Sequence, residues 1–144
     1  MATTTAARAA IVAEARRWLG TPYHHHGRVQ GVGVDCAMLL AEVFESVGLV
    51  ARVEPGTYPH DWHLHRSEER FLSWVERCGA RETGTPEPGD VAIFKYGRAY
   101  SHGAVLVERD LSVVHAYIGM GVIESRITEE PLAGRPCRYF TLLG

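Results

Sequence analysis

One cysteine of this chain stands at a point where the sequence predicts the start of a helix. Gly33 and Val34 lead into Asp35 and Cys36, and an apolar run follows them. Asp35 is a favourable helix N-cap, because its carboxylate can accept from the unpaired N–H groups of the first turn. Cys36 would then hold the first helical position, where the helix dipole favours an anion and lowers the pKa of a thiol. These features predict a nucleophilic thiolate, and a small buried apolar residue is the alternative.

Two histidines could serve such a nucleophile, which needs a base and a partner that orients the base. His102 opens a predicted strand at residues 102–108, and His115 lies in the next predicted strand at residues 113–118. A short turn joins these strands, so we expect them to pair, with facing Cβ atoms about 4.5–5.5 Å apart. His102 and His115 are therefore expected to touch, with His102 facing Cys36. Two ordinary core histidines are the alternative.

The first half of the chain has the apolar periodicity of helices, which must position the cysteine. The sequence predicts one helix over residues 3–19 and a second over residues 35–47. A third is expected between a cap at Ser67 and a stop at Gly79. The Gly-rich and His-rich residues 21–34 are expected to form a loop that leads into the second helix.

After residue 80 the pattern changes to short apolar runs separated by tight turns, which predicts an antiparallel meander. The expected strands cover residues 91–96, 102–108, 113–118, 122–127 and 138–143. Helices followed by strands indicate an α+β fold, with the helices packed on one side of a sheet of about five strands. A chain of 144 residues suits one core, so a single domain over residues 1–144 is expected.

Composition excludes several classes of function. The 15 basic and 17 acidic residues give a net charge of −2 without a basic block, so no nucleic-acid partner is expected. No apolar run approaches the roughly 18 residues that a membrane span needs. Residues 1–8 lack the pattern of a secretory signal peptide, and the three cysteines are an odd number. Synthesis in the cytoplasm is therefore expected, and nothing in the sequence calls for a cofactor.

Five short motifs add a family resemblance to this chemistry. They occur along the chain in the order Leu19-Gly20-Thr21-Pro22-Tyr23, Asp35-Cys36, Pro88-Gly89-Asp90, Ser101-His102-Gly103 and Val114-His115-Ala116. In type, order and approximate spacing the set resembles the NlpC/P60 cysteine peptidases, which are cell-wall hydrolases with a reduced papain-like fold. The resemblance covers nearly the whole chain.

The resemblance implies a role for each matching residue. Cys36 would be the nucleophile, His102 the general base and then acid, and His115 the polar residue that orients His102. The Tyr23 hydroxyl would lie near the oxyanion site, beside the Cys36 backbone N–H, where donors stabilise a tetrahedral intermediate. Asp35 would also contact the free amine or amide of the substrate. The implied substrate is a peptidoglycan stem peptide, cut between γ-linked D-Glu and the diamino acid.

The residues after the cysteine depart from the family. NlpC/P60 proteins usually have Asp-Cys-Ser-Gly, where this chain has Ala37 and Met38 after the cysteine. Met38 is much bulkier than Gly, so the stem-peptide specificity is left open. Met38, Ser101 and Trp62 complete the residues expected to contact substrate.

The segment 58–65, Tyr-Pro-His-Asp-Trp-His-Leu-His, resembles an insert of the phage branch of the family. That branch comprises small tail-associated peptidases, so the resemblance implies phage-tail proteins as partners and incorporation into a virion-like particle. His60, His63, His65 and Asp61 are zinc-type ligands, but their spacing favours packing of the insert over a metal site. We expect no metal.

Other interpretations stay open at this stage. His24, His25 and His26 could form a solvated loop or a wall of the cleft. The chain could be a structural or binding module of a tail assembly with weak or lost activity. It could also be an amidase or acyltransferase with the same Cys–His machinery, because a fold does not fix its chemistry.

Overall fold

The computed structural model describes residues 4–50 and 70–143. Its helices are α1 (Thr4–Arg17), α2 (Cys36–Ser46) and α3 (Arg70–Arg77). Its strands are β1 (Arg28–Val29), β2 (Gly33–Val34), β3 (Arg81–Glu82), β4 (Val91–Tyr96), β5 (Ala99–Leu106), β6 (Ser112–Tyr117), β7 (Gly121–Arg126) and β8 (Cys137–Thr141).

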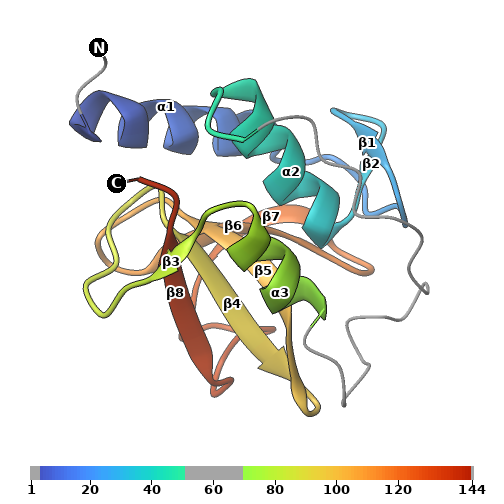
Figure 1. The fold of residues 1–144 in the computed structure, drawn as a ribbon. Helices are drawn as coiled ribbons and strands as arrows, with labels where there is room; N and C mark the ends of the chain where they lie inside the picture. Colours follow the sequence, from blue (N-terminus) through green and yellow to red (C-terminus); the bar gives the residue numbers. More distant parts are fainter. Residues whose placement is uncertain (1–3, 51–69, 144) are drawn as a thin grey trace.

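Within these residues, six strands form one antiparallel sheet in the order β3-β8-β4-β5-β6-β7, and β1 pairs with β2 in a separate hairpin. Figure 1 shows α2 and α3 over one face of this sheet, with α1 lying across one end. The predicted α+β fold with helices on an antiparallel sheet is confirmed. The sheet has six strands in place of the five expected, because β3 pairs with β8.

The main core lies between the helices and the sheet. Ile11 of α1, Leu39 and Val43 of α2, and Val105 and Val114 of the sheet are all buried in one apolar cluster. Burying a side chain of this size contributes about 1.5–3 kcal/mol. The face of α2 that packs here therefore fixes the helix firmly, and with it the position of its first residue.

The other face of the sheet carries a second apolar cluster. Phe94 of β4 and Leu106 of β5 pack there with Leu132, which belongs to the connection between β7 and β8. This connection therefore covers the face of the sheet that the helices leave open.

Strand boundaries differ from the predicted ones most at β5. This strand begins at Ala99, three residues before the expected start at His102. Gly97 has a φ of 66°, which favours glycine, and Tyr96 pairs directly with Ala99 across the two-residue turn. The register shifts between Phe94 and Lys95, so Phe94 faces His102 on the neighbouring strand.

The expected loop over residues 21–34 contains the β1–β2 hairpin. Tyr23 bridges Val34 in parallel, since the Val34 N–H donates to Pro22 and the His24 N–H donates to Val34. Arg28 of β1 reaches α2 and bonds Glu42 and Glu45 at 3.1 and 2.8 Å. The hairpin is thus held against the helix that begins at Cys36.

A buried ion pair ties α1 to the turn before β4. Arg8 Nη1 lies 2.8 Å from Asp90 Oδ1, and the Asp90 side chain is 1% exposed. The other oxygen of Asp90 accepts from the Glu87 N–H at 2.9 Å. The Pro88-Gly89-Asp90 motif therefore closes its own turn and also anchors the first helix.

None of the helices in the described residues is both long and apolar enough to cross a membrane.

Candidate active site

The N-terminus of α2 is capped as the sequence predicts. Asp35 has extended backbone angles, and its Oδ1 accepts from the Met38 N–H at 2.9 Å. Its Oδ2 accepts from the His26 N–H at 2.8 Å. The Asp35 side chain is 0% exposed, so the carboxylate is occupied inside the protein and holds the start of α2.

Cys36 is the first residue of α2, and it is 1% exposed. Burial raises the pKa of its thiol, and the negative charge of Asp35 raises the pKa further. Backbone hydrogen bonds from Gly103, Ala37 and Cys36 itself lower the pKa by less. The expectation of a lowered pKa is therefore wrong for this structure, because burial outweighs the helix N-terminus. The thiol is therefore protonated at neutral pH, and it could act as a nucleophile only after giving its proton to a base.

The contact with Gly103, the residue that follows His102, places the Cys36 thiol beside β5. The registered pairs of β5 with β6 are Val105 with Val114 and Leu106 with Val113, further along β5. Helix α2 contacts both strands. The thiol therefore meets β5 just before β5 pairs with β6.

His102 and His115 meet as predicted. Nε2 of His102 lies 2.9 Å from Nδ1 of His115, and both side chains are buried. Nε2 of His115 lies 3.2 Å from the Ser125 hydroxyl. Burial lowers the pKa of His115 to about 4, so this ring is neutral at pH 7. A neutral ring can accept from His102 through Nδ1, whereas a protonated ring could not.

Aromatic rings enclose the His102 imidazole. The rings of Tyr96 and Tyr117 both lie 5.5 Å from it, centroid to centroid, in edge-to-face arrangements. The Arg135 guanidinium stacks over Tyr96 at 3.6 Å. This packing restricts the rotation of the His102 ring. A base needs such restriction, because it must stay aligned with its partner.

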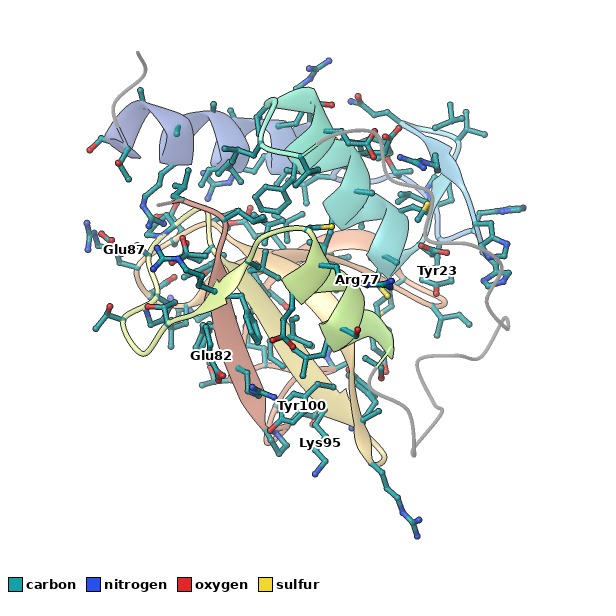
Figure 2. The ribbon with its side chains drawn as sticks, viewed as in Figure 1. Tyr23, Arg77, Glu82, Glu87, Lys95 and Tyr100 are labelled. Atoms are coloured by element: carbon teal, nitrogen blue, oxygen red, sulfur yellow. The ribbon has the colours of Figure 1, made fainter. Side chains whose placement is uncertain are left out.

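Tyr23 lies close to the thiol. Burial raises the pKa of its hydroxyl most, and a negative charge on Cys36, once its thiol ionises, and the charge of Asp35 raise the pKa further. Figure 2 shows Tyr23 beside the end of α2 that adjoins the β1–β2 hairpin. A phenol with a raised pKa stays protonated at neutral pH, so it can donate a hydrogen bond. Together, a buried thiol, a paired base and a nearby donor can support attack on a carbonyl group.

Comparison with known families decides the relationship. The model of the NlpC/P60 family matches residues 20–139. This chain belongs to the NlpC/P60 family. The match includes every described residue of the site. No curated protein matches the sequence.

Solved structures agree with this NlpC/P60 fold. One similar structure is the NlpC/p60 domain of the peptidoglycan hydrolase SagA, with a TM-score of 0.58 and 20% identity over 91% of this chain and 96% of that one. A second is an NLP/P60 family protein from Staphylococcus aureus subsp. aureus Mu50, described as similar to lipoprotein, with a TM-score of 0.63 and 18% identity over 96% of this chain and 42% of that one. A third, from Bacillus cereus ATCC 10987, has a TM-score of 0.60 and 16% identity over 91% and 39% of the two chains. At these identities the likeness concerns the fold.

The remaining predicted site residues of this NlpC/P60 domain lie in different settings. Ser101 is buried and its hydroxyl donates to the Ala99 carbonyl at 3.4 Å. Met38 is buried, and its N–H takes part in the Asp35 cap. Trp62 lies outside the described residues. Contacts of Asp35, Ser101 and Met38 with substrate stay predictions, since all three are closed to solvent in this structure.

The sequence did not reveal that the segment 24–26 contacts Asp35, the N-cap of α2. His25 Nδ1 lies 3.9 Å from Asp35 Oδ2, and its ring stacks near that of His26 at 3.9 Å between centroids. His25 therefore lies near the start of α2, whereas His24 and His26 are exposed, so a cleft wall and a solvated loop both stay open. Gly103 and Ser125 were also missed, because their contacts depend on tertiary packing.

Within residues 4–50 and 70–143, no group of three or more His, Cys, Asp or Glu side chains could hold a metal ion. The histidines of segment 58–65 lie outside these residues.

Proposed function

We propose that this NlpC/P60 domain is a cysteine peptidase that hydrolyses an amide bond in peptidoglycan stem peptides. The observation that carries the proposal is the contact of the Cys36 thiol with the backbone of Gly103, next to a histidine that is already paired with His115. Nucleophile, base and orienting residue come from three separate elements, α2, β5 and β6.

His102 activates the thiol. Its Nε2 is engaged with His115, so Nδ1 is the ring nitrogen that takes the thiol proton. The S–H bond of Cys36 breaks, an N–H bond forms on His102, and the thiolate attacks the carbonyl carbon of the substrate. An acceptor at Nδ1 of His115 stabilises the positive charge that His102 then carries.

The tetrahedral intermediate places a negative charge on the former carbonyl oxygen. The Tyr23 hydroxyl and the Cys36 backbone N–H are the donors that would stabilise it. His102 returns its proton to the leaving nitrogen as the C–N bond breaks, which leaves an acyl group on Cys36. Water then hydrolyses this thioester, with His102 again as base.

Peptidoglycan is supported as the substrate by the family and by the domain of SagA, which is described as a peptidoglycan hydrolase. The proposed bond joins γ-linked D-Glu to the diamino acid of the stem peptide. Met38 stands where the family usually has Gly, so the range of accepted stem peptides is expected to be narrower than in the family.

Product analysis tests the proposal. Purified peptidoglycan is incubated with the wild-type protein, with Cys36→Ala and with Cys78→Ala, and released peptides are identified by mass spectrometry. We expect release by the wild type and by Cys78→Ala, and none by Cys36→Ala with an unchanged circular dichroism spectrum. Peptide release that survives Cys36→Ala contradicts the mechanism. Transfer of the acyl group to an added amine would indicate an acyltransferase.

A structural or binding module is the second candidate. Two observations favour it: Cys36 is only 1% exposed, and Met38 beside it is buried. Alkylation with iodoacetamide at pH 5.5 separates the two. A thiol activated by His102 reacts faster than Cys36 in a His102→Ala variant, whereas in an inactive module both react at the same slow rate.

A phage-tail location is also proposed. Its support is the resemblance of segment 58–65 to the insert of the phage branch. In this role the chain is made in the cytoplasm and joins tail proteins before it meets the wall. Mass spectrometry of purified tail particles from a producing strain should detect it, and its absence from such particles would contradict this location.

A further inference from the structure

Ser125 of β7 extends the pair formed by His102 and His115. His115 faces Ile123 across the β6–β7 pair, and Ser125 is two residues further along the same strand. Side chains at such diagonal positions lie on one face of a sheet and can touch. The Ser125 hydroxyl lies 3.2 Å from His115 Nε2, so the three residues form one line of hydrogen bonds.

The direction of these hydrogen bonds matters for catalysis. His102 Nε2 and His115 Nδ1 lie 2.9 Å apart, and one proton is shared in the hydrogen bond between them. If His102 supplies this proton, then Nδ1 of neutral His102 is unprotonated and can accept the thiol proton. If His115 supplies it, then neutral His102 carries its proton on Nδ1 and cannot act as a base there.

When His102 is protonated, only one placement of the protons on the two rings is compatible with the hydrogen bond. Both nitrogens of an imidazolium are donors, so the charged His102 requires a bare Nδ1 on His115. Neutral His115 then carries its proton on Nε2, which faces Ser125. Without an acceptor at this point, a largely buried N–H would stay unpaired while His102 is charged, which is costly.

We propose that Ser125 is a positioning residue for the base, because its hydroxyl oxygen accepts the Nε2–H of His115 and turns the bare Nδ1 of His115 toward His102. This inference rests on the proposed role of His102 as base. Ser125 acts through His115 and does not touch the substrate.

The test compares three variants of the full chain. Ser125→Ala removes the hydroxyl, and Ser125→Thr keeps it. Ser112→Ala is the matched control, since its hydroxyl bonds Asp110 at 2.7 Å on the neighbouring strand β6. We expect Ser125→Ala to lower kcat roughly tenfold with KM unchanged, while Ser125→Thr and Ser112→Ala stay near the wild type.

Nitrogen-15 NMR of the histidine rings reads the arrangement directly. In the wild type, His115 should carry its proton on Nε2, and in Ser125→Ala the two neutral forms of His115 should mix. A Ser125→Ala variant with the wild-type ring signals overturns the proposal, and so does a Ser125→Thr variant as impaired as Ser125→Ala. If the wild type releases no peptide from peptidoglycan, the proposed function fails, but the ring signals and the alkylation rate of Cys36 still decide the role of Ser125.

Discussion

His102 and His115 come from adjacent strands and share one hydrogen bond, with Nε2 of the first 2.9 Å from Nδ1 of the second. Both rings are buried, and burial lowers the pKa of His115 to about 4. His115 is therefore neutral at pH 7. A neutral His115 can accept a hydrogen bond from His102, as the proposed mechanism requires of the residue that orients the base.

The low pKa of His115 makes the protein less stable in acid. In the unfolded chain His115 has a pKa of about 6.5, so between pH 6.5 and 4 the unfolded state binds more protons than the folded state. The free energy of unfolding should therefore fall as pH falls through this window, by about 3 kcal/mol from this residue. Above pH 6.5 the residue makes no pH-dependent contribution. Urea unfolding at pH 7 and pH 4 measures this loss.

His115→Gln isolates that contribution, because Gln does not titrate. The variant should lose about 3 kcal/mol less than the wild type between pH 7 and pH 4. Equal losses in the two proteins would show that His115 does not carry the effect.

Asp35→Asn should make the thiol more acidic. The charge of Asp35 raises the pKa of Cys36, and the amide oxygen of Asn can still cap the helix. The pH profile of Cys36 alkylation should therefore move to lower pH, with Glu42→Gln as the control on α2. An unchanged or higher midpoint in Asp35→Asn would contradict the effect of this charge.

Tyr23→Phe should reduce turnover and leave folding intact. If the hydroxyl donates to the oxyanion, its loss should lower kcat by about 10²-fold with little change in KM. Tyr139→Phe is the control, since Tyr139 lies on β8 in the apolar cluster of the opposite sheet face. Steady-state kinetics with a soluble stem peptide measure both. A Tyr23→Phe variant with wild-type kcat would remove Tyr23 from the oxyanion site.

Arg8→Ala should destabilise the fold. The Asp90 side chain is 1% exposed and pairs with Arg8 at 2.8 Å, so the variant leaves a buried charge without its cation. Such a change costs about 3 kcal/mol or more. Arg109→Ala is the control, because the Arg109 side chain is 82% exposed and its pairing with Glu87 should contribute at most about 0.5 kcal/mol. Equal effects in urea unfolding would contradict the importance of the buried pair.

Local signals in the sequence were sufficient for the start of α2 and for the two histidines. Asp35 caps the helix through its own next turn, which depends on residues close in sequence. The contact of His102 with His115 follows from two strands joined by a short turn. In both cases the contact joins residues that are close in sequence, so local patterns are enough to predict it.

Features that depend on distant packing were not predictable. The pKa of Cys36 is set by burial under elements far away in sequence, and this reverses the effect expected from the helix dipole. The β1–β2 hairpin has strands of two residues, which are too short to show a period. The contact of Ser125 with His115 depends on the register of β6 and β7, which no local pattern reveals.

The most direct measurement is the mass of the protein during turnover of a soluble stem peptide, quenched in acid and mapped by tandem mass spectrometry. A cysteine peptidase should carry the acyl half of the substrate on Cys36, and this adduct should be absent from Cys36→Ala and from His102→Ala. Stem-peptide cleavage without any adduct, at a rate that Cys36→Ala retains, would contradict a nucleophilic role for Cys36.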